Sequence, residues 1–177
     1  PSWASPSTTG STAAWPTQTV RLVVGFPAGS SPDLTARALA EPLSKALGQN
    51  VIVENKVGAG GNIAADFVAK STDGHTLGLM INGNMTIARI LNPKVPYDPL
   101  KSFVAVTKLV DSPYVLLVNP KLPANTVKEL IALAKAQPDT LHYASSGNGS
   151  SQHLMGGLFE SLAGVKMKHV PYRGSSG

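Results

Sequence analysis

The first group of residues that could do chemistry lies where an apolar run gives way to a turn rich in Gly and Ser. Leu22–Val24 is typical of a buried strand, and the turn Gly25–Gly29 follows it directly. Ser31 then offers an N-cap hydroxyl, Pro32 suits the first helical position and Asp33 falls in the first turn. A helix N-terminus presents unpaired N–H groups and the positive end of its dipole, so this loop favours an anion. The residues expected to contact a ligand here are Ala28, Gly29, Ser30, Ser31 and Asp33.

A second unit of the same kind follows far downstream. Leu141–Ala144 reads as a strand and 152–163 as a helix, with His153 in its first turn. The loop between them has four hydroxyls and two glycines in seven residues, more than a plain connection needs. Its ligand-binding candidates are Ser145, Ser146, Gly147, Asn148, Gly149, Ser150 and the adjacent His153. Two such loops predict a clamp for a small anion, whereas a glycine turn that only joins strand to helix is the alternative for the first loop.

Other chemistries fit the sequence poorly. Gly58–Gly61 lacks the G-x-G-x-x-G spacing of a dinucleotide site, so we interpret it as close packing. A hydrolase built from Ser150, His153 and Asp33 lacks the G-x-S-x-G elbow. Asp33 remains open between contact with a ligand and a simple first-turn charge. We expect no cofactor. We also expect no metal site, because none of the four histidines has a partner at metal-ligand spacing: His75, His142, His153 and His169.

Composition limits the class of protein. The chain has 177 residues, is 42% hydrophobic and contains no cysteine, which excludes disulfides and Cys-ligated zinc. Its net charge is +5, but the basic residues are scattered and aromatic residues make up only 6%, so no nucleic-acid partner is expected. A mildly basic surface or attraction of an anionic ligand explains that charge. The sequence has no apolar run of 18 residues, so we expect no membrane span.

Strands and helices alternate along the first half of the chain. Strands are expected at Val20–Val24, Val51–Glu54 and Thr76–Ile81, with helices at Asp33–Leu47 and from an N-cap at Asn62. Such alternation predicts an α/β fold with a parallel sheet. A turn at Asn82–Asn84 follows the third strand at the same sheet edge, which makes Asn82 and Asn84 further ligand candidates.

The second half repeats the α/β pattern. Thr126 and Glu129 form a capping box that starts a helix, and Gly164 is expected to end the helix at 152–163. The strands expected here are Val104–Val110, Tyr114–Val118, Leu141–Ala144 and Met167–Pro171. We divide the chain into an uncharged, flexible leader (1–18), a first lobe (19–103) and a second lobe (104–177).

At these residues the chain resembles the periplasmic solute-binding receptors of tripartite tricarboxylate transporters, often called Bug receptors. The resemblance runs through almost the whole chain from Trp15. Its blocks are Trp15-Pro16, Val20–Gly29 with Asp33, Leu47-Gly48, Val51–Asn55, Gly58–Asn62, Asp73–Leu77, Asn92-Pro93, Pro96–Pro99, Leu130–Lys135, Ser146–Gly149 with His153-Leu154, and His169–Gly174.

The resemblance implies a two-lobed "Venus flytrap" fold whose parallel-rich sheets are flanked by helices. Backbone N–H groups and hydroxyls of the second loop would hold a ligand carboxylate, and the first loop would hold its far end, partly through water. The ligand would be a di- or tricarboxylate, an acidic amino acid or an aromatic acid. The protein would be an exported periplasmic monomer without catalytic activity that delivers ligand to membrane permease subunits. Closure would pivot near 101–110.

Two departures from the family pattern matter. The first loop reads Gly29-Ser-Ser-Pro-Asp33 where the family has Gly-Gly-Ser/Thr before Asp, so Pro32 removes one backbone donor. The family also runs to greater length, and from that we expect an incomplete second lobe. An enzyme acting on a small organic acid, and a ligand sensor for a signalling partner, remain the alternative functions.

Overall fold

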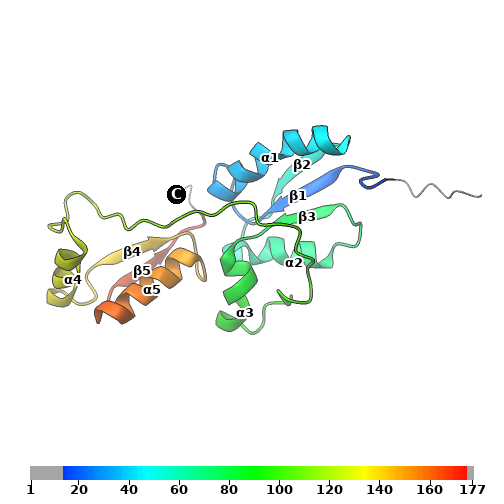
Figure 1. Cartoon of the computed structure of the whole chain (residues 1–177). Coiled ribbons are helices and arrows are strands. Elements are labelled where there is room, and N and C mark those ends of the chain that lie inside the picture. Colours follow the sequence, from blue (N-terminus) through cyan, green and yellow to red (C-terminus); the bar gives the residue numbers. More distant parts are fainter. Residues whose placement is uncertain (1–13, 175–177) are drawn as a thin grey trace, which may run out of the picture.

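The computed structural model describes residues 14–174 and separates the chain into two α/β lobes (Figure 1). In the first lobe, three parallel strands lie in the order β2-β1-β3. The elements are β1 (Val20–Val24), α1 (Ser31–Leu47), β2 (Val51–Asn55), the 3₁₀ turn η1 (Ala59–Gly61), α2 (Asn62–Lys70) and β3 (Thr76–Leu79). Because β2 and β3 lie on opposite sides of β1, right-handed crossovers place α1 and α2 on opposite faces of the sheet.

The sequence pattern explains this packing. Val20, Leu22 and Val24 on the central strand are buried, and the apolar stripe of α1 covers them through Ala36, Ala40 and other residues of one helix face. Gly48 ends α1 in the left-handed conformation at φ 67°, as expected for a helix C-terminus. The predicted parallel α/β architecture is therefore confirmed for this lobe.

The chain after β3 differs from the prediction. In place of a turn at Asn82–Asn84, a π-helical segment η2 (Gly83–Ile87) leads into a short helix α3 (Ala88–Leu91). The following Pro-rich stretch closes a second small core, where Tyr97 packs edge-on against Phe103 with ring centroids 5.5 Å apart. Periodicity over so few residues did not separate a turn from a helix.

The second lobe consists of α4 (Val127–Ala136), β4 (His142–Ser145), α5 (Ser151–Ala163) and β5 (Lys168–Pro171). Strands β4 and β5 pair in parallel. The predicted capping box is confirmed, because Thr126 accepts from the Glu129 N–H while the Glu129 carboxylate accepts from the Thr126 N–H. Gly164 ends α5 in the left-handed conformation.

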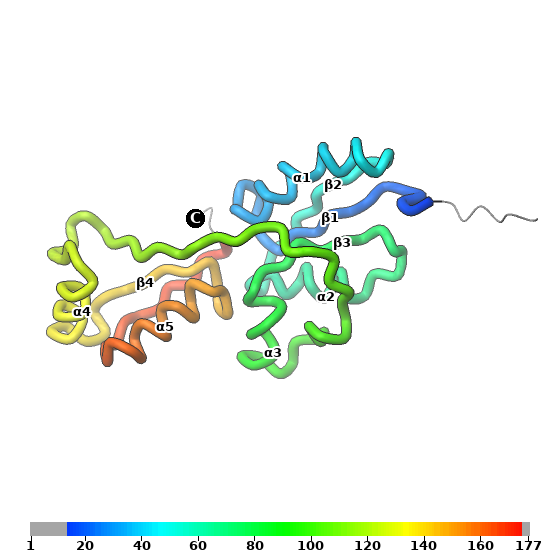
Figure 2. Tube along the Cα trace, in the orientation of Figure 1, coloured from blue at the N-terminus to red at the C-terminus, as the bar shows by residue number. Residues whose placement is uncertain are grey.

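The strands predicted at 104–110 and 114–118 are wrong for the described chain. Residues 104–118, which we call the connecting segment, run extended between the lobes without pairing with any described strand (Figure 2). Its apolar side chains are exposed, with Val104 at 91% and Leu117 at 82%. The β-branched pattern indicates residues suited to a sheet, but a strand also needs a neighbour to complete its hydrogen bonds, and none is present in the described part.

This geometry predicts where proteolysis begins. Within residues 20–174, we expect the first cleavage by trypsin at Lys108 and by chymotrypsin at Tyr114 or Leu116, because exposed backbone outside a hydrogen-bonded ladder enters a protease readily. Mass spectrometry of a limited digest locates the cuts. Initial cleavage inside α1 or β1 would contradict the assignment of 104–118 as the least protected part of this region.

Part of the predicted leader belongs to the first lobe. Residues 1–13 lie outside the described structure, whereas Trp15 donates from its indole to the Gly74 carbonyl at 2.9 Å and Pro16 is buried. The Thr17 N–H donates to His75 Nε2 at 3.0 Å. Trp15, Pro16 and Thr17 are therefore held against the first lobe, at the end of the predicted leader. No helix in the described region has the length and apolarity needed to cross a bilayer.

Candidate functional site

The first loop ends in a tightly organised turn at the start of α1. Ser30, not Ser31, occupies the N-cap position, and its hydroxyl donates to the Pro27 carbonyl at 2.6 Å rather than capping a helical N–H. Ser30 is buried, while Ala28 and Gly29 are exposed. The predicted cap was one residue too late because Pro32 is accommodated at the second helical position as well as at the first.

Asp33 organises this turn from inside. Its side chain is 1% exposed, and its two oxygens accept from the Gly29 N–H at 2.8 Å, the Asn55 amide at 2.8 Å and Arg37 Nε at 2.9 Å. The Arg37 guanidinium, ahead of the Asn55 and Gly29 bonds, lowers the pKa of Asp33 to about 2. With three donors already engaged, the carboxylate is placed to hold the loop in shape.

The second loop wraps the N-terminus of α5. Ser150 is its N-cap, and the Ser150 hydroxyl accepts from the His153 N–H at 3.3 Å. Ser146 donates to the Gln152 side chain at 3.0 Å, and the Ser150 N–H donates to the Gly147 carbonyl. Ser145 and Ser150 are buried, while Asn148 is exposed.

Several donors of this loop remain available. The backbone N–H groups of Ser146, Asn148 and Ser151 donate to no acceptor among the described residues. Ser146 and Asn148 lie in the loop that leads into the positive end of the 13-residue helix α5, and Ser151 is its first residue. Such a set of donors matches a carboxylate or another small oxyanion.

Glycines of the first lobe lie directly against the second loop. A methyl group on Gly60 would lie 2.9 Å from the Asn148 carbonyl oxygen, and one on Gly83 would lie 2.5 Å from that of Gly149. Gly61, at φ 91°, packs under the Asn84 amide. The close-packing interpretation of Gly58–Gly61 is therefore supported, and the packing joins the two lobes.

The first loop reaches the same place from the other side. A methyl group on Gly25 would lie 2.6 Å from the Gly61 Cα, and one on Gly174 would lie 3.0 Å from Pro27 Cδ. Both predicted loops thus converge on the segment around Gly61, at the carboxyl ends of β1 and β4. This is the sheet edge where ligands bind in open α/β folds.

Asn84 has a different place from the one expected of a ligand contact. It is 2% exposed, and its amide nitrogen donates to the Gly60 carbonyl and to Asn62 Oδ1, both at 2.9 Å. The Tyr97 hydroxyl donates to Asn62 Oδ1 at 2.9 Å. Asn62 is thereby drawn into this buried network, and Gly61 takes the N-cap position of α2 that was predicted for Asn62. Asn82 is exposed at the start of η2.

The geometry does not assemble a Ser-His-Asp triad. Ser150 is bonded to the backbone of His153, the His153 ring contacts Gly149, and Asp33 is engaged by Arg37. The described residues also contain no group of three His, Cys, Asp or Glu side chains that could hold a metal ion.

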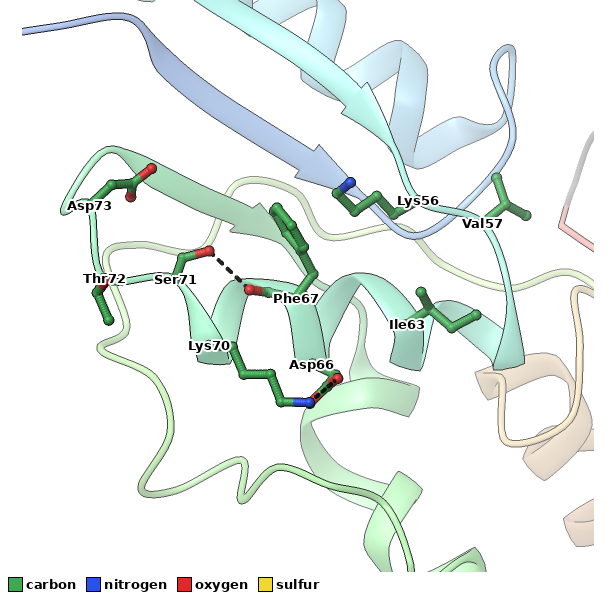
Figure 3. Close-up of a pocket in the computed structure, with 9 residues that line it drawn as sticks. All are labelled: Lys56, Val57, Ile63, Asp66, Phe67, Lys70, Ser71, Thr72 and Asp73. Atoms are coloured by element: carbon green, nitrogen blue, oxygen red, sulfur yellow. Dashed lines mark hydrogen bonds and ion pairs between the residues drawn. The ribbon is translucent and has the colours of Figure 1, made fainter.

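A separate hollow of about 630 Å³ lies beside α2 (Figure 3). Its two lysines are already engaged: Lys70 pairs with Asp66 at 2.7 Å, and Lys56 Nζ lies 4.0 Å from the Phe67 ring centroid. This hollow is open to solvent, and it lies apart from the backbone N–H donors of the second loop.

Sequence reasoning missed several residues that shape the loops. Asn55 and Arg37 hold Asp33, and His169 contacts Ser145 with its Nε2 atom 2.6 Å from the hydroxyl oxygen. Asn55 ends the strand next to β1, so its position at the shared sheet edge was a usable signal. His169 carried no such signal, because its partner is 24 residues away.

The chain matches, over residues 35–177, the family described as tripartite tricarboxylate transporter family receptor. It is 38% identical over 164 residues to the UPF0065 protein in the tcbD-tcbE intergenic region of Pseudomonas sp. (strain P51), covering 92% of this chain and 48% of that protein. It is 40% identical over 163 residues to Protein BugT of Bordetella pertussis (strain Tohama I), covering 91% of this chain and 50% of BugT. The chain thus spans about half the length of these curated relatives.

Two solved structures share the fold closely. Rpa4515 of R. palustris with adipate has a TM-score of 0.87 at 39% identity, covering 92% of this chain and 55% of that one. MatC (Rpa3494) of Rhodopseudomonas palustris with bound malate has a TM-score of 0.84 at 35% identity, covering 91% and 55%. The matched family is a receptor family, and two further solved neighbours are the periplasmic binding protein BugD and a TctC solute binding protein from Polaromonas, so the family and these neighbours are solute-binding receptors rather than enzymes.

Proposed function

Because the chain belongs to the tripartite tricarboxylate transporter receptor family, we propose that it binds a small carboxylate between its two loops as part of a periplasmic receptor. One ligand carboxylate accepts from the N–H groups of Ser146, Asn148 and Ser151, which lack acceptors within the described chain. The far end of the ligand meets the first loop at Ala28–Ser31. Those unpaired donors at the N-terminus of α5 are the observation that carries the proposal.

The chemistry of the donors favours a carboxylate over a neutral solute. Hydrogen bonds from N–H groups to an ionised oxygen are charge-assisted and stronger than neutral ones, so no arginine is needed. Adipate in one neighbour and malate in another support a dicarboxylate. Two acidic ends separated by a short spacer also suit two loops that face each other.

The two-lobed shape also suggests how the ligand is delivered to the membrane permease subunits. The lobes are joined by the connecting segment and touch through glycines, so they can close around a ligand without breaking a core. The closed form is then the one that membrane permease subunits recognise. A sensor for a signalling partner would use the same closure, and its genomic neighbours distinguish the two.

A binding panel tests the proposal. We expect adipate or malate to raise the thermal unfolding temperature saturably, because a ligand that binds only the folded state stabilises it. The neutral diamides of the same acids are matched controls and should give no shift. Citrate, glutamate and benzoate define the ligand class, and mass spectrometry of the incubated acid detects turnover. No shift with any acid, or product formation, would contradict a carboxylate receptor.

A further inference from the structure

The imidazole rings of His153 and His169 both contact the second loop. His153 Nδ1 lies 3.1 Å from the Gly149 backbone nitrogen. Since a backbone N–H can only donate, Nδ1 must be the acceptor, and the proton of the neutral ring sits on Nε2. His153 therefore fixes the Gly149 N–H as a neutral imidazole.

The second ring supports the other side of the loop. His169 stacks on His153 with centroids 4.0 Å apart and planes 10° apart, and on Tyr143 at 5.0 Å. Its Nε2 atom lies 2.6 Å from Ser145 Oγ, which in turn accepts from the Gly147 N–H at 3.1 Å. The two histidines thus hold both glycines that flank Asn148.

We propose that His153 is a positioning residue for the second loop, that it works only as the neutral imidazole, and that acidification therefore weakens carboxylate binding. This inference rests on the function proposed above. It adds that the shape of the second loop depends on pH, which the backbone donors alone do not explain.

Protonation has a definite structural consequence. A proton on His153 Nδ1 would oppose the Gly149 N–H, so two donors would face each other and the bond would be lost. The stacked ring geometry also disfavours a charge on both histidines. Burial, followed by the proximity of the His153 ring, lowers the pKa of His169.

The surroundings offer little to compensate a cation. Among the described residues, the titratable groups shown to act on the ring stack are Tyr143 on β4, which stacks on His169, and Glu160 on α5, whose carboxylate already accepts from the Met167 N–H at 2.7 Å. On the side of the first lobe, the residues that lie against Gly149 include the uncharged Gly83 and Leu91. Protonation is therefore expected to loosen the loop rather than to create a new ion pair.

The test compares three variants of the 177-residue chain. His153→Asn places an amide oxygen near the position of Nδ1 but does not titrate, and His153→Leu removes the acceptor. His142→Asn is the matched control, because His142 is exposed on β4 outside the ring stack. Amide NMR follows Gly149 without ligand from about pH 8 to 5, and calorimetry measures the Kd of adipate across the same range.

We expect the Gly149 amide to titrate in the wild type and in His142→Asn but not in His153→Asn. The wild-type Kd should rise about tenfold relative to that of His153→Asn on acidification, a ratio that cancels the titration of adipate itself. His153→Leu should bind about fivefold more weakly at pH 7.5, with His153→Asn restoring affinity. A Gly149 amide that titrates equally in His153→Asn, or a constant Kd ratio, would overturn the inference. If adipate binds to no variant, the receptor proposal fails and the NMR titration still decides the role of His153.

Discussion

Replacing Asp33 by asparagine is expected to lower the free energy of unfolding by about 2 to 3 kcal/mol and to disorder the first loop. Gly29, Asn55 and Arg37 all direct donors at this buried carboxylate, so an amide NH₂ group must face at least one of them. The fall in pKa from 3.8 to about 2 corresponds to about 2.5 kcal/mol at ~1.4 kcal/mol per pKa unit. Urea unfolding monitored by circular dichroism measures the loss.

The same residue sets an acid dependence with a defined sign. A carboxyl group whose pKa is lowered by folding stabilises the protein fully above its unfolded pKa, and this contribution disappears as pH falls from about 4 to about 2. Asp33→Asn should flatten the pH dependence of stability in that window. Glu41→Gln on the same helix removes only an exposed ion pair with Lys45, and should cost less than ~0.5 kcal/mol. Equal losses in both variants would contradict the assignment of Asp33.

Replacing Gly83 by alanine is expected to weaken dicarboxylate binding about tenfold while leaving the first lobe folded. Gly83 lies in the helical segment η2, where alanine fits the backbone, but its methyl group would lie 2.5 Å from the Gly149 carbonyl oxygen of the other lobe. The clash acts between lobes, and overpacking of this kind costs ~1–3 kcal/mol. Because opening of the lobes relieves this clash, we expect the substitution to disfavour lobe closure and to leave the free energy of unfolding of the first lobe unchanged.

Gly157→Ala provides the matched control. Gly157 lies in α5 with no atom within 4 Å of an added methyl group, so alanine should leave affinity unchanged and stabilise the helix slightly. Calorimetric Kd values and unfolding temperatures for the two variants separate closure from stability. Unchanged adipate affinity in Gly83→Ala would show that the observed contact between η2 and the second loop is not part of the bound state.

Local signals predicted most of the regular structure. The capping box at Thr126, the left-handed ends at Gly48 and Gly164 and the alternation of strands with helices depend on neighbours a few residues apart. The family resemblance, read from blocks spread along the chain, is confirmed by the family match. Fold class followed from the same local patterns.

Errors arose where a distant partner decides the outcome. Residues 104–118 have strand-like composition, yet pairing needs a neighbouring strand that local sequence does not reveal. Asn62 has a side chain suited to an N-cap, but in the fold its Oδ1 atom accepts hydrogen bonds from Asn84 and Tyr97 instead. In the site, the helix-end argument identified both loops, whereas the support from Asn55 and His169 depends on tertiary contacts.

Amide chemical-shift mapping with adipate tests the central claim most directly. On titration of the ¹⁵N-labelled chain, we predict saturable shifts of Ser146, Asn148 and Ser151 in the second loop together with Gly29 in the first. Neutral adipamide should leave the chemical shifts of all four amides unchanged. Shifts confined to the hollow at Lys56 and Phe67, or a second loop that does not respond while the acid binds, would contradict binding between the two loops.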